Sequence, residues 1–174
     1  MANYAPSTRA RIADLNVGIR VETGTYPCVT HHHINQQEVF NVFGRIQITH
    51  LFCEFITDNA GAASGFVFNY TITAPAAVGP FAMGVISADA AALVAGSRIV
   101  MVGGAVGVGT HSLVVATGGY SSLATTTTIL GGLDHESTIG ILTDGEATGG
   151  TAKCVLIYVP MSDGAYVTGN VLPV

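Results

Sequence analysis

Side chains alternate along residues 65–73 in the pattern of a β-strand. Phe66, Phe68, Tyr70 and Ile72 fall on one face, and Val, Asn and Thr residues fall on the other. A period of two is that of a strand with one face in a core. Elsewhere the apolar runs are short and are bounded by Gly, Asn, Asp or Pro, with Gly at 22 of 174 positions. Many short strands joined by turns have this composition, so the sequence predicts an all-β fold.

The longer segment before this strand, residues 38–57, changes phase along its length. Ile46 and Ile48 share one face, whereas beyond His50 the odd-numbered positions become apolar. A β-bulge next to His50, or a subunit contact on the second face, would explain the change. The turn of small residues at 58–65 predicts that this segment and the following strand form a hairpin.

About ten short strands with few helices predict one β-sandwich domain, of jelly-roll type, over residues 18–174; a barrel is the alternative. Residues 1–17 carry Arg9 and Arg11, two of the six basic residues, and have no strand pattern. We expect them to form an extended N-terminal arm that reaches onto a neighbouring subunit. A frayed terminus is the alternative.

Charged residues make up only 10% of the chain, and its mean hydropathy is +0.51. Because soluble domains usually contain about a quarter charged residues, we expect other subunits to cover much of this surface. No apolar run reaches the roughly 20 residues of a transmembrane helix, and the N-terminus lacks the apolar segment of a signal peptide. The net charge of -5, with six basic residues, leaves no basic patch for nucleic acid. The expected setting is a reducing cytoplasm, with neither nucleic acid nor membrane as a partner.

The histidine run at 31–33 is the strongest metal-binding pattern. In a strand His31 and His33 project to the same face, but zinc needs three or four ligands and no cysteine or acidic residue stands at a suitable spacing. We therefore expect no metal, with His31 and His33 as the only candidate ligands, and interpret His31, His33 and His50 as interface residues. Three cysteines, odd in number and widely spaced, predict buried free thiols.

No arrangement of residues is typical of catalysis. The Gly-rich run at 102–109 precedes strand-like sequence and lacks the lysine of a phosphate-binding loop. Asp134, His135 and Glu136 are adjacent, but neighbours in a strand or turn point apart, which favours a polar turn. We expect no catalytic residue, no cofactor and no enzymatic activity.

Two segments carry a resemblance to a known family. Residues 40–55, FNVFGRIQITHLFCEF, contain the pattern FNV-x-G-R-hydrophobic-x-IT-x-L, and residues 150–167, GTAKCVLIYVPMSDGAYV, contain L-x-Y-x-P-x-x-x-GA-x-V. The two segments cover about a fifth of the chain. They resemble small virion proteins of tailed bacteriophages, in which Gly is common where Cys53 stands.

The resemblance implies a β-sandwich that decorates or cements a phage capsid, commonly as a trimer that clamps neighbouring capsid subunits, and it brings no catalytic residues. We accordingly expect a homotrimer on the capsid exterior with the major capsid protein as its partner. On strands whose two faces are both apolar, the second face, which points away from the core, would make the trimer contacts. Arg9 and Arg11 would contact the capsid. The alternatives are a tail, neck or fibre-base protein of the same virion and a carbohydrate-binding β-sandwich.

Overall fold

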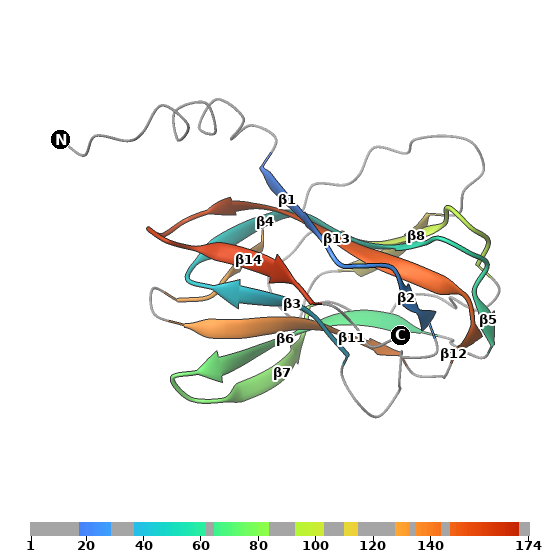
Figure 1. The fold of residues 1–174 in the computed structure, drawn as a ribbon. Coiled ribbons are helices and arrows are strands. Elements are labelled where there is room, and N and C mark those ends of the chain that lie inside the picture. Colours follow the sequence, from blue (N-terminus) through green and yellow to red (C-terminus); the bar gives the residue numbers. More distant parts are fainter. Residues whose placement is uncertain are drawn as a thin grey trace.

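The computed structural model describes residues 18–28, 37–61, 65–83, 93–102, 110–114, 128–132, 135–143 and 147–170. Within these residues the chain forms strands and no α-helix, so the all-β prediction is confirmed (Figure 1). The strands are β1 (Ile19–Glu22), β2 (Tyr26–Pro27), β3 (Gln37–Phe43), β4 (Ile46–Phe55), β5 (Ala60–Gly61), β6 (Phe66–Ala74), β7 (Val78–Ala82), β8 (Arg98–Val102), β9 (Thr110–Val114), β10 (Thr128–Leu130), β11 (Glu136–Thr143), β12 (Ala147–Gly149), β13 (Thr151–Pro160) and β14 (Tyr166–Gly169).

Two antiparallel sheets pack face to face (Figure 1). The first sheet has the order β1-β13-β4-β8-β9, with β10 also paired to β4 and β2 to β13. The second has the order β14-β3-β11-β6-β7, and β5 and β12 form a separate two-stranded sheet. This arrangement is the expected sandwich and not a barrel. The jelly-roll topology stays a prediction, and the arm at 1–17 lies outside the described residues.

The core lies between the two sheets, where alternate side chains of both sheets meet. Its largest fully buried side chains are mostly aromatic and β-branched, as a pleated, half-buried surface favours: Tyr26, Phe40, Phe55, Phe66, Phe68, Ile46, Ile48, Leu51, Met83, Ile99, Met101 and Ile139. Phe66 and Phe68 pack edge to face, with their ring centroids 5.0 Å apart. Close packing of this kind between two sheets needs no metal or disulfide to hold it.

The change of phase in residues 38–57 has the predicted cause. Along β4, Ile48 pairs with Tyr158 and His50 pairs with Ile157, so Thr49 is an extra residue in the ladder. The Thr49 hydroxyl donates to the carbonyl of Ile157 at 3.0 Å. The bulge next to His50 is therefore confirmed, and it turns the side chains beyond it to opposite faces.

The predicted hairpin between β4 and β6 is wrong, because the two strands lie in different sheets. After β4 the chain leaves the first sheet: the Asn59 amide donates to the carbonyl of Leu93, and a carboxylate oxygen of Asp58 accepts from the Ala95 amide. A turn of small residues permits both a hairpin and a crossing between sheets. The partners available to each strand decide between the two, and they come from distant parts of the chain.

Three connections between the sheets meet at one end of the sandwich. They join β3 to β4, β10 to β11 and β13 to β14. Gly44, with φ +73° between β3 and β4, donates its amide to the carbonyl of His135, and the Met161 amide donates to the carbonyl of Arg45. A Cβ on Gly131 would collide with the carbonyl oxygen of Gly44. We call this end, seen at the left of Figure 1, the crossover end.

Candidate interaction surface

Among the described residues, the large apolar side chains that remain exposed lie mostly toward the crossover end and on the edge strand β7, with Ile19 on β1 as a further one. Each of the following is 41–48% exposed: Val78, Phe81, Ile129, Met161 and Tyr166. Met161 and Tyr166 flank the turn between β13 and β14, Ile129 pairs with Gln47 near the start of β4, and Val78 and Phe81 belong to β7. Ile56 and Val94, also exposed, lie instead beyond the other end of β4.

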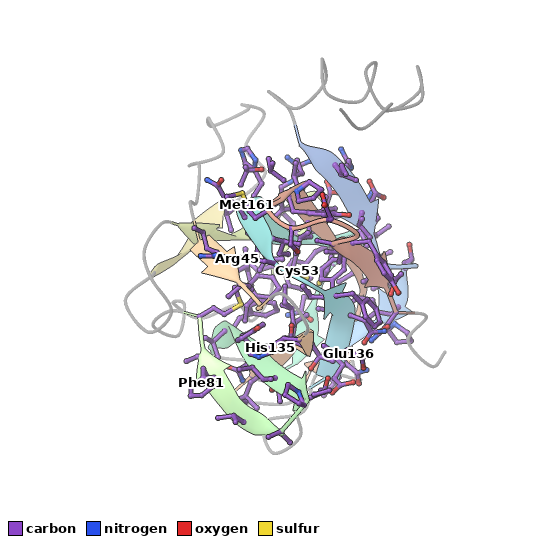
Figure 2. The ribbon with its side chains drawn as sticks, turned by 90° about the vertical axis from the view of Figure 1, so that its left-hand side faces the viewer. Arg45, Cys53, Phe81, His135, Glu136 and Met161 are labelled. Carbon is purple, nitrogen blue, oxygen red and sulfur yellow. The ribbon has the colours of Figure 1, made fainter. Side chains whose placement is uncertain are left out.

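Figure 2 looks directly onto the crossover end. Arg45 and Met161 lie beside the first sheet, His135 and Glu136 lie beside the second, and Phe81 lies at the margin of the second sheet. The ring of Tyr166 stacks on Phe43 at a centroid distance of 4.5 Å. This stacking holds an exposed aromatic side chain in a fixed position at the surface.

Residues 74–82 extend the apolar surface, because this stretch is uncharged and mostly exposed. Among the described strands, β7 pairs with β6 alone and lies at the edge of the second sheet. Pro80 and a register shift interrupt that edge, and both features hinder strand addition by another chain. The surface is therefore suited to side-chain contact and not to extension of the sheet. Sequence reasoning missed it, although the uncharged run with two prolines was a readable signal.

The outer face of the first sheet does not offer the apolar contact that we expected from the second faces of the strands. Phe52, Val100 and Val155 lie side by side on that face and are only 0–3% exposed within the single chain. They are already buried, so they have little area left for a trimer contact. The expected trimer contact stays a prediction, because burial within one chain also accounts for the apolar pattern of these three residues.

Ion pairs cross the same outer face in a continuous row. Arg20 pairs with Glu22, Lys153 Nζ lies 3.5 Å from Glu22 Oε2 and 3.6 Å from Glu54 Oε2, and an Arg98 guanidinium nitrogen lies 2.8 Å from Glu54 Oε1. Burial alone would raise the pKa of Glu22, but the hydrogen bond and charge of Arg20, together with Lys153, outweigh it and lower the pKa. Three of the six basic residues thus pair with two carboxylates within the chain.

His50 projects from the outer face of the first sheet, because the bulge at Thr49 places it opposite Ile157 and away from the core. Its Nδ1 lies 3.3 Å from the hydroxyl oxygen of Thr49. Burial lowers the pKa of His50. The His50 side chain therefore lies outside the core, and its interface role stays a prediction.

Arg9, Arg11, His31 and His33 lie outside the described residues, so their predicted roles are not placed by the fold. Among the residues that are described, no group of three or more His, Cys, Asp or Glu side chains is arranged to hold a metal ion. In that part of the chain, no helix is long and apolar enough to span a membrane.

The three cysteines are buried free thiols, as predicted. Cys53 and Cys154 lie opposite each other on β4 and β13, and both contact the hydroxyl of Tyr26, whose oxygen is 3.7 Å from Cys53 Sγ and 3.3 Å from Cys154 Sγ. Hydrogen bonding to Cys154 and burial raise the pKa of Cys53, and burial raises the pKa of Cys28 to about 12. The thiols of Cys28 and Cys53 are therefore protonated at neutral pH.

Comparison of this chain with protein-family models, with curated proteins and with solved structures finds no match.

Proposed function

We propose that this chain is a structural protein of a tailed-bacteriophage particle that decorates and cements the capsid by binding between capsid subunits. One observation carries the proposal: the two segments that resemble phage virion proteins pair with each other in the fold. Residues 40–55 form β3 and β4, and residues 150–167 form β13 and the start of β14. Although about 100 residues separate them, β4 pairs with β13 and β14 pairs with β3, so they form one unit across both sheets.

The tip of this unit is part of the crossover end. It presents Met161 and Tyr166, and β7, at the opposite edge of the second sheet from β14, adds Val78 and Phe81. Exposed apolar side chains gathered at one end of a domain mark an interaction surface more often than scattered ones do. Burial of this surface against capsid subunits would hold the subunits together, at about 25 cal/mol per Å² of apolar area.

The size of this surface favours binding as an oligomer. Five side chains, each leaving about 80–100 Å² exposed, amount to about 400 Å², roughly half of what one partner contributes to a stable interface. Further contact has to come from other copies or from other surfaces, such as the segment with Arg9 and Arg11. A homotrimer on the capsid exterior, bound to the major capsid protein, meets this requirement.

Antibody labelling of phage particles tests the proposal. Antibodies against the purified chain, applied to particles of the phage that encodes it, are expected to label the head when viewed by electron microscopy. Label on the tail or neck would favour the alternative virion location, and the absence of label from particles would overturn the proposal. Particles assembled without the chain should release DNA at a lower temperature, and addition of purified chain should restore the wild-type temperature.

Light scattering tests the oligomer separately. A trimer of 17.8 kDa chains has a mass of about 53 kDa. A monomer at all concentrations would exclude the trimer in solution, and glycan binding by that monomer would favour the carbohydrate-binding alternative.

A further inference from the structure

Cys53 and Cys154 occupy a special position in the β4–β13 pair. The Cys154 amide donates to the Thr23 hydroxyl at 2.9 Å, and the Cys154 carbonyl accepts from the Thr23 amide at 3.0 Å. Since both backbone groups of Cys154 point toward Thr23, neither points toward Cys53. The two cysteines are therefore a non-hydrogen-bonded pair of an antiparallel ladder, in which the side chains of opposite residues are closest.

Cα atoms in such a pair are about 4.5 Å apart, within the range of about 4.4–6.8 Å that a disulfide spans. Both side chains point into the core between the sheets, where Figure 2 places Cys53. The Tyr26 hydroxyl contacts both sulfur atoms, at 3.7 Å from Cys53 Sγ and 3.3 Å from Cys154 Sγ. No rearrangement of the strands is needed to bring the sulfur atoms together.

We propose that Cys53 and Cys154 are a site of oxidative modification, at which a peroxide joins β4 to β13 by a disulfide. One cysteine, as thiolate, attacks a peroxide oxygen, and the O–O bond breaks to leave a sulfenic acid and hydroxide. The second thiol then attacks the sulfenic sulfur, forms the S–S bond and releases water. Overall, two thiols are oxidised and one hydrogen peroxide is reduced to two water molecules.

A peroxide suits this site better than a large disulfide reagent, because hydrogen peroxide is close to water in size and both sulfur atoms are fully buried. The reaction should be slow at neutral pH and faster at higher pH, since only the thiolate reacts. The bond would close a loop of about 100 residues and is expected to raise the midpoint of thermal unfolding by about 5–15 °C. This inference does not depend on a role in a virion.

The experiment treats the native full-length chain with hydrogen peroxide and then counts free thiols after unfolding. We expect the count to fall from three to one, with a mass loss of 2 Da, and peptide mapping should link Cys53 to Cys154. The Cys28→Ser variant is the matched control: it keeps the pair and should lose both of its thiols with the same mass change.

Three results would overturn the proposal. They are three intact thiols after prolonged treatment at pH 9, a disulfide that includes Cys28, and oxidation beyond the sulfenic acid without a crosslink. Cys154→Ser should retain both thiols at the reagent concentration that closes the bond in the wild type. If that variant does not fold, the mapping of the wild-type and Cys28→Ser chains still decides the outcome.

Discussion

Replacement of Phe81 by Ser tests whether the crossover end is the binding surface. Phe81 is 41% exposed on the edge strand β7. For a side chain that buries about 200 Å², this leaves about 80 Å² for a partner to cover. At about 25 cal/mol per Å², loss of that contact weakens binding by about 2 kcal/mol, which is about 30-fold in Kd.

Ile56 is the matched control, since it is also 41% exposed but lies beyond the opposite end of β4. Ile56→Ser removes a comparable apolar side chain and should change the Kd by less than about twofold, within the spread expected of a surface substitution. The assay sediments capsids that lack the chain with increasing amounts of each variant and measures the bound fraction. Thermal unfolding of each variant separates an effect on binding from an effect on folding.

Equal affinity of Phe81→Ser and the wild type would refute the assignment of the crossover end. An equal loss in both variants would refute it as well, because the effect would then not be specific to that end. A 30-fold loss confined to Phe81→Ser, at unchanged unfolding temperature, is the expected result.

Three further predictions concern stability. Gly169→Ala should destabilise the fold by about 1–3 kcal/mol in urea unfolding, because its Cβ would collide with the backbone carbonyl of Glu22, whereas Gly24→Ala meets nothing within 4 Å and should be near neutral. Glu54→Gln should cost about 1–2 kcal/mol, since it removes the anion between Arg98 and Lys153, and a loss unchanged at 1 M salt would contradict this electrostatic origin. Burial lowers the pKa of His50 in the folded chain, so the unfolded chain takes up that proton at higher pH. The contribution of His50 to the free energy of unfolding is complete above about pH 6.5, and it falls as the pH drops toward the lowered pKa of the folded chain. His50→Gln should remove this part of the pH dependence of stability. An unchanged pH dependence in the variant would contradict the prediction.

Local patterns account for the elements that the sequence predicted correctly. The alternation in residues 65–73 gave β6, and the change of phase beyond Ile48 located the bulge at Thr49, because each follows from the period of two in a single strand. The prediction of buried free thiols likewise followed from the odd number and wide spacing of the cysteines.

Partners across the sandwich could not be predicted in the same way. The turn at 58–65 suggested a hairpin, yet β4 pairs with β13, about 100 residues away, and β6 pairs with β11. An apolar second face on β4 suggested a subunit contact, yet Phe52 is buried within the chain. In both cases the local pattern fits more than one arrangement, and contacts between distant segments select one.

The amino-acid sequence by itself determined the all-β class, the main strands and the bulge, since strand periodicity and turn residues act over a few neighbouring positions. Only the tertiary structure decided that Cys53 faces Cys154, that His50 points outward, and that Met161 and Tyr166 remain exposed beside the turn between β13 and β14. These depend on the register between strands far apart in the chain, where a shift of one residue moves every side chain to the other face.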